Sequence, residues 1–122
     1  MKKKKSPTAI SLSPRLRITN GDDIAFGPGK AELLRHVGET GSIGKAARRM
    51  NMSYMRAWSL IQTMNRSFKE PLVNAAHGGE GGGGAALTET GRQVLALYRR
   101  MERASLHAVA SPWKKLRRLL DV

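Results

Sequence analysis

The fold is decided by residues 41–58, whose sequence is GSIGKAARRMNMSYMRAW. Ser42 and Ser53 each precede a stretch with helical apolar spacing, and a hydroxyl at such a position can accept a backbone N–H at the start of a helix. The stretch therefore predicts one helix opening after Ser42 and another opening after Ser53. Asn51 lies between them and suits a turn, because asparagine tolerates the left-handed backbone conformation better than most residues.

The spacing of small and apolar residues favours a helix-turn-helix here, with a plain helical hairpin as the alternative. Ala46 and Ala47 are small enough to let the first helix approach the second closely. The second helix is expected from Tyr54 to about Phe68, with apolar residues on its rear face and polar residues in front. A helix that packs on a domain and enters the major groove of DNA needs this division.

Short strands and two further helices are predicted around this pair. Alternating apolar residues on both sides of Asn20-Gly21 predict a strand or hairpin over residues 16–26. A helix is expected from Lys30 to the glycines at 38 and 41, and two strands at 72–75 and 85–87 enclose a glycine run at 78–84. Thr88 is expected to begin a helix that continues to about Ser105 and is broken by Pro112. The fold class is mainly α with a small β wing: a winged helix-turn-helix with a long C-terminal helix.

Composition limits the partner and the chemistry. The 122 residues fit one domain, and 22 Lys and Arg against 9 Asp and Glu give a formal charge of +13, which suggests a polyanionic partner but does not separate DNA from RNA or an anionic membrane. The absence of cysteine excludes disulfides and thiolate metal sites and fits a cytoplasmic, nucleoid-associated protein. We expect residues 1–14 to be a disordered basic leader, 15–110 the DNA-binding domain and 111–122 a basic tail.

No pattern in the sequence predicts catalysis or a cofactor. His36, His77 and His107 lie in three separate segments, and no His pair or carboxylate pair has the spacing of a metal or acid–base site. The stretch Gly27-Pro28-Gly29-Lys30 lacks the Ser or Thr that follows the lysine of a phosphate loop. We therefore expect no enzyme activity, no cofactor and no metal.

Three motifs together resemble a known family. They are Gly41-Ser42-Ile43 with Ala46-Ala47, then residues 53–58, then the glycine run followed by Leu87-Thr88. From about Arg15 to Arg103 the chain resembles the N-terminal DNA-binding domain of ModE-type, molybdate-responsive transcription regulators, which is similar to the LysR-type winged helix. The resemblance implies a homodimer on a palindromic operator. Because the chain stops at Val122, we expect it to lack the family's C-terminal oxyanion-binding domains and not to sense molybdate alone.

The expected DNA contacts lie on the second helix of the pair, at the start of the first helix and in the wing. Arg56 suits either a guanine or a phosphate, Trp58 is expected to pack, and the glycine run, whose alternative is a flexible linker, offers backbone N–H groups despite Glu80. The alternative function is a non-specific nucleoid or RNA-binding protein, and a membrane-surface role for residues 113–120 ranks last. The full set of expected contacts is Ser42, Lys45, Ser53, Tyr54, Arg56, Ser59, Thr63, Arg66, Gly79, Gly81 and Gly82.

Overall fold

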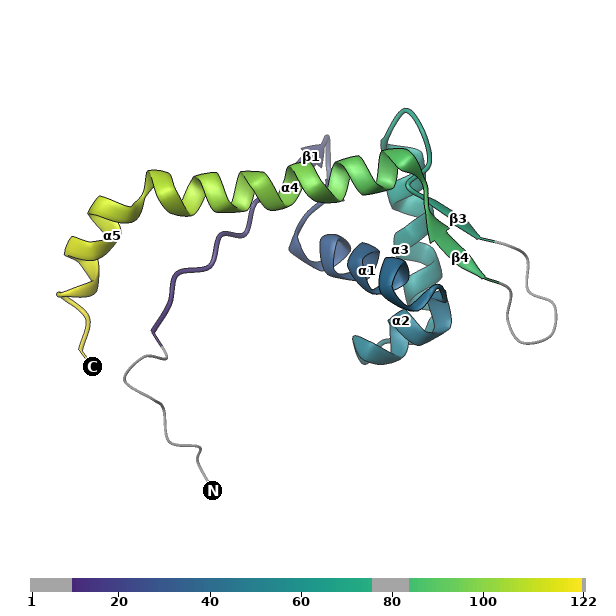
Figure 1. The fold of residues 1–122 in the computed structure, drawn as a ribbon, viewed down its shortest axis with the longest axis horizontal. Coiled ribbons are helices and arrows are strands. Elements are labelled where there is room, and N and C mark those ends of the chain that lie inside the picture. The colour runs from purple at the N-terminus through teal and green to yellow at the C-terminus, as the bar shows by residue number, and fades with distance from the viewer. Residues whose placement is uncertain (1–9, 76–83, 122) are drawn as a thin grey trace, which may run out of the picture.

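The computed structural model describes residues 10–75 and 84–121. Three helices pack together beneath one end of a long helix, and a two-stranded wing leaves the same end (Figure 1). The elements in chain order are β1 (Ile18–Asn20), β2 (Asp23–Phe26), α1 (Pro28–Thr40), α2 (Ile43–Arg49), α3 (Tyr54–Ser67), β3 (Val73–Ala75), β4 (Ala85–Leu87), α4 (Glu89–Ala108) and α5 (Ala110–Arg117). The predicted winged helix-turn-helix with a long C-terminal helix is confirmed.

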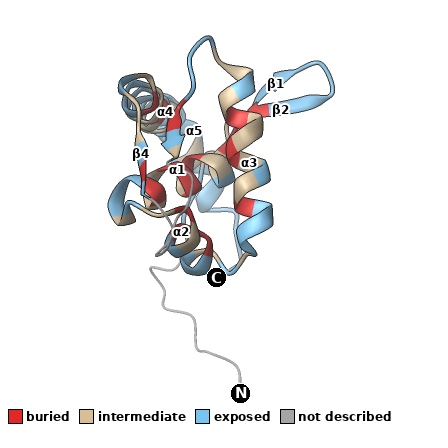
Figure 2. Ribbon diagram, turned by 90° about the vertical axis from the view of Figure 1, so that its right-hand side faces the viewer, coloured by how far each residue is buried: buried red, intermediate tan, exposed pale blue. Residues whose placement is uncertain are grey.

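The core lies where α1, α2 and α3 face one another, as the buried segments in Figure 2 show. Leu33, Leu34 and Val37 supply the buried face of α1, and Ala46 and Ala47 supply that of α2. Helix α1 begins at Pro28, two residues before the predicted start. Proline suits this position because the first N–H groups of a helix have no partner within it. The buried residues of α3 are Ala57, Ile61 and Met64.

Each two-stranded sheet is an antiparallel hairpin. The predicted turn between β1 and β2 is confirmed, and Gly21 adopts a positive φ of 65° there. Alternation of apolar residues correctly predicted the strands, whose residues are unequally buried. Phe26 is fully buried, whereas Ile18 and Ile24 remain 40% and 43% exposed because the hairpin projects beyond the helices.

Helix α4 has one large, fully buried side chain, that of Tyr98, and Val94 and Leu95 pack partly buried beside it. Tyr98 is 2% exposed, its ring meets Phe26 edge to face at 5.1 Å, and its hydroxyl donates a 2.6 Å hydrogen bond to the carbonyl of Leu16. The predicted cap is confirmed, since the Thr88 hydroxyl accepts the N–H of Gly91 at 2.9 Å. From Arg99 to the end of α4, none of the residues that the structure describes is buried.

The end of α4 follows from proline chemistry. Pro112 was expected to break the helix, and the break falls at Val109, because the ring of a proline clashes with the carbonyl four residues earlier, here Ala108. The chain then resumes as α5, with Pro112 in its first turn. The basic tail is therefore helical through Arg117. Within the described parts of the chain, no helix combines the length and apolar character needed to cross a bilayer.

Candidate nucleic-acid interface

The turn between α2 and α3 has the predicted geometry. Asn51 has a φ of 55°, which makes it the single non-glycine residue with positive φ in the described chain. The N–H groups of Met50 and Met52 donate to the carbonyl of Ala47, both at 3.0 Å, and so close the end of α2. These hydrogen bonds hold the turn residues against the C-terminal end of α2, from which the chain enters α3.

Both predicted serine caps are present. The Ser42 hydroxyl accepts the N–H of Lys45 at 3.1 Å, and the Ser53 hydroxyl accepts the N–H of Arg56 at 3.1 Å. Each cap satisfies a backbone donor that the helix itself cannot. The side chain of Lys45 extends from an exposed position on α2. The first turns of α2 and α3 are thus held in a defined orientation.

The solvent-facing side of α3 contains the remaining predicted contact residues. Tyr54 is 52% exposed, Arg56, Ser59 and Arg66 are exposed, and Thr63 is half-buried. The Thr63 hydroxyl donates to the carbonyl of Ser59 at 3.1 Å, which turns its O–H proton towards its own helix. Polar residues occur on this side from the first turn of α3 to its last.

Two apolar side chains complete the first turns of α3. Trp58 is half-buried and packs against the core, as predicted, and its ring is nearly parallel to that of Tyr54 with centroids 6.4 Å apart. Met55 is 70% exposed and is not among the predicted contact residues. The ring of Tyr54 thus lies beside that of Trp58 on the first turns of α3.

The wing is joined to the helices at both strands. The side chain of Asn65 in α3 accepts the N–H of Leu72 at 2.8 Å and donates to the carbonyl of Val73 at 3.1 Å. The N–H of Ala85 in β4 donates to the carbonyl of Gly41 at 2.9 Å. Asn65 was missed because nothing local in the sequence distinguishes it from a surface asparagine. The expected contacts Gly79, Gly81 and Gly82 lie outside the described residues.

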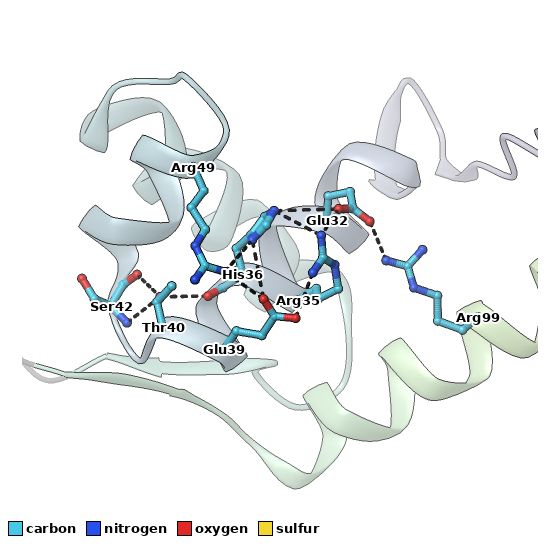
Figure 3. Close-up of polar contacts among 8 residues, drawn as sticks. All are labelled: Glu32, Arg35, His36, Glu39, Thr40, Ser42, Arg49 and Arg99. Carbon is cyan, nitrogen blue, oxygen red and sulfur yellow. Dashed lines mark hydrogen bonds and ion pairs between the residues drawn. The ribbon is translucent and has the colours of Figure 1, made fainter. Parts of the chain in front are cut away.

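An ion-pair network lies on the solvent-exposed side of α1 (Figure 3). Glu32 contacts Arg35 at 2.8 Å and Arg99 of α4 at 2.7 Å, while Glu39 contacts Arg35 and Arg49 of α2 at 2.8 Å each. Hydrogen bonds from Arg35 and then Arg99 hold the pKa of Glu32 below its ordinary range. Hydrogen bonds from Arg35 and then Arg49 do the same for the pKa of Glu39. The network joins three helices by charge.

The His36 side chain, 15% exposed, lies inside this network. Its ring nitrogens lie 3.8 Å from Glu32 and 4.0 Å from Glu39, and guanidinium nitrogens of Arg35 and Arg49 lie at 3.4 and 3.3 Å. In the described residues, no three His, Asp or Glu side chains are arranged to hold a metal ion. The surroundings of His36 are those of a structural ion-pair network.

The sequence model for bacterial regulatory helix-turn-helix proteins of the LysR family matches residues 29–92, which is more than half of the chain. The chain therefore belongs to the LysR family of bacterial regulatory helix-turn-helix proteins. The matched residues run from α1 through the wing into the first turn of α4.

Curated relatives match over the same region. The chain is 41% identical to the molybdenum-pterin-binding protein MopB of Rhodobacter capsulatus, over 75% of this chain and 34% of that protein. It is 38% identical to the molybdenum transport protein ModE of Azotobacter vinelandii (78% and 35%), and 42% identical to the DNA-binding transcriptional dual regulator ModE of Escherichia coli K12 (58% and 27%). The chain thus spans about a third of the length of these relatives.

Among solved structures, the fold matches the DNA-binding domain of CbnR in its complex with DNA. The TM-score is 0.57 at 19% identity, and the match covers 72% of this chain and 95% of that domain. Full-length CbnR bound to its target DNA matches with a TM-score of 0.53 at 21% identity, over 71% of this chain and 28% of that protein. At these identities the matches show that the chain shares the fold of that domain.

Proposed function

We propose that this chain is a sequence-specific double-stranded DNA-binding transcription regulator, acting in the cytoplasm on the nucleoid, and that it has no enzymatic activity. The observation that carries the proposal is the exposed polar face of α3, held in place by two serine caps and the positive-φ turn at Asn51. A helix fixed in this way can enter the major groove with its N-terminal half. Membership in the LysR family and the formal charge of +13 support the same conclusion.

The interface we propose has three parts within a DNA-binding unit of residues 15–110. Helix α3 lies in the major groove, the start of α2 meets the adjacent backbone, and the glycine run between β3 and β4 lies against the flanking phosphates or the minor groove. Side chains of α3 recognise bases, with Arg56 suited to a guanine or a phosphate, and the other two parts supply position. The residues are Ser42 and Lys45 of α2, then Ser53, Tyr54, Arg56, Ser59, Thr63 and Arg66, then Gly79, Gly81 and Gly82.

We further propose a homodimer formed through α4. Leu97 and Met101 are 53% and 45% exposed and lie four residues apart, so they share one face of the helix. A second copy that packs the same face against this one would remove both side chains from water. Such a two-fold dimer places two copies of α3 on a palindromic operator, with half-sites roughly 34 Å or a multiple of that distance apart.

The test is a selection of bound fragments from the host genome by the full chain. Binding of the recovered duplex is then compared with a shuffled duplex, a hairpin RNA and anionic vesicles at one salt concentration. We expect a specific-to-shuffled affinity ratio of about 10³ or more. Ratios near one for shuffled duplex or hairpin RNA would instead support the alternative, a non-specific nucleoid or RNA-binding protein.

A matched pair of variants connects the selection to α3. Ser59→Glu places a carboxylate on the exposed face of α3, whereas Ala96→Glu places one on an exposed turn of α4. Both residues are exposed in helices, so both variants should fold. We expect Ser59→Glu to abolish specific binding and Ala96→Glu to retain it, because a carboxylate inside the groove is repelled by the phosphates.

A further inference from the structure

Four cationic side chains from three segments surround one hollow beside the first turn of α3. The hollow measures about 370 Å³ and is bordered by Arg15 and Arg17 of the N-terminal segment, Lys30 of α1 and Arg56 of α3. Among the residues that the structure describes, no carboxylate borders it. Its apolar surface comes from Ile24, Met50, Met52 and Leu60.

None of these four cations forms an ion pair within 4.0 Å among the described residues. Arg15, Arg17 and Arg56 are exposed, whereas Lys30 is half-buried and donates to the carbonyl of Ile24. Burial lowers the pKa of the Lys30 ammonium, and the nearby Asp23 opposes this effect. Bringing like charges together without compensation is unfavourable unless an anion joins them.

The position of the hollow relative to the wing favours a DNA phosphate as this anion. The hollow lies at the N-terminal end of α1, and the wing is joined to the C-terminal end of α1 through Gly41 and Ala85. Helix α1 has 13 residues and is therefore about 20 Å long. A major groove about 12 Å wide, together with the backbones on its two sides, spans a comparable distance.

We propose that the hollow bordered by Arg15, Arg17, Lys30 and Arg56 binds a phosphate group, and that this group is a DNA backbone phosphate on the side of the groove opposite the wing. The apolar surface of the hollow suits the deoxyribose next to that phosphate. The inference rests on the proposed function, and it assigns Arg56 to positioning the backbone rather than to recognising a base.

The test compares two double variants of the full chain with equal loss of charge. Arg15→Gln/Arg17→Gln removes two cations from the hollow, and Lys114→Gln/Lys115→Gln removes two exposed cations from α5 at the far end of the molecule. Affinity for a random-sequence duplex is measured over a range of salt concentrations by fluorescence anisotropy, and melting temperatures confirm that both variants fold.

We expect the hollow variant to reduce the slope of log affinity against log salt by about 0.9 for each lost phosphate contact. At 0.1 M salt this corresponds to roughly tenfold weaker binding for one contact. The α5 variant should keep the slope of the parent. Equal slopes for parent and hollow variant would overturn the inference while leaving DNA binding, and thus the proposed function, intact.

A second measurement separates a DNA phosphate from a free one. Inorganic phosphate is titrated against sodium chloride at matched ionic strength, and the melting temperature is recorded for the parent and the hollow variant. We expect a small saturable rise for the parent alone. The same rise together with an unchanged DNA slope would assign the hollow to a small phosphate compound and overturn the backbone assignment. If the parent binds no duplex at all, the proposed function and the backbone assignment fail together.

Discussion

Two groups of arginines lie on this molecule, and they differ in what surrounds them rather than in residue type. Arg35, Arg49 and Arg99 each contact a glutamate at 2.7–2.9 Å and join α1, α2 and α4. Arg15, Arg17 and Arg56 face a hollow with no carboxylate. The glutamates of α1 and α4 thus neutralise the cations that hold the helices together, and the hollow remains available for an external anion. A net charge of +13 conceals this division.

The largest loss of stability is expected from a charge placed in the buried core. Ala47 is 1% exposed in the core between the helices, and Ala47→Glu would bury a carboxylate without a partner there. Such a change destabilises a domain by several kcal/mol, roughly 3 or more. Thermal unfolding measured by circular dichroism should show a variant that is largely unfolded.

The control for this prediction is Ala96→Glu. It makes the same chemical change at an exposed position of α4, with Arg99 and Arg100 one turn away, so it should melt close to the parent. If Ala47→Glu also melted like the parent, the assignment of Ala47 to the contact between α2 and α3 would be wrong.

The next largest effect sharpens the role of Arg56. If Arg56 holds a phosphate at the hollow, Arg56→Gln should weaken binding to specific and shuffled duplexes alike, by roughly tenfold at 0.1 M salt. Both affinities are measured by titration with labelled duplex. A loss of about 1 to 3 kcal/mol confined to the specific duplex would instead make Arg56 a base-recognising residue.

The sequence predicted the elements of the fold because their signals are local. Ser42, Ser53 and Thr88 could be recognised as caps, and Asn51 as a turn residue, from their immediate neighbours alone. The start of α1 lies two residues before the predicted one, because proline is accepted in the first turn, where its missing N–H is not needed. The break at Val109 lies three residues before Pro112, because the ring of a proline acts on the turn that precedes it. The exposure of Ile18 and Ile24 could not be predicted, because alternation does not reveal whether another layer covers a hairpin.

The proposed interface was less accessible from the sequence, because it depends on contacts between distant residues. The network from Glu32 to Arg99 spans 67 positions, and the hollow joins Arg15 to Arg56. No local pattern marks either of them. The exposed residues of α3 could be predicted from helical spacing. Their roles on DNA stay predictions, as do those of Gly79, Gly81 and Gly82.

A smaller effect is expected from a paired arginine, and it should fall on stability rather than on DNA. Arg99 contacts Glu32 at 2.7 Å and Glu102 at 2.9 Å, and its side chain is 28% exposed. Arg99→Gln should lower the free energy of unfolding by about 1 kcal/mol, the upper end for partly exposed ion pairs. Urea denaturation measures the loss.

The same Arg99→Gln variant should bind duplex DNA with the salt dependence of the parent, apart from the effect of one lost charge. The hollow variants should show the opposite result, with a changed salt slope and an unchanged stability. A hollow variant that loses stability, or an Arg99 variant that loses a phosphate contact, would abolish the distinction between the two groups of arginines.

The smallest effect is the pH dependence of the ion-pair network. Arg35 and its neighbours lower the pKa values of Glu32 and Glu39 in the folded state, so the unfolded chain binds more protons in mild acid. Stability from these carboxylates is therefore complete above the pKa of the unfolded chain, about 4.3, and is lost as the pH falls through the lower folded values. Because both side chains are 40% or more exposed, solvent and salt screen the effect.

We expect the melting temperature of Glu32→Gln/Glu39→Gln to fall less steeply than that of the parent as the pH drops below about 5. Glu70→Gln, at an exposed residue without an ion pair in the described chain, should follow the parent. Parallel curves for the double variant and the parent would show that the network leaves acid stability unchanged.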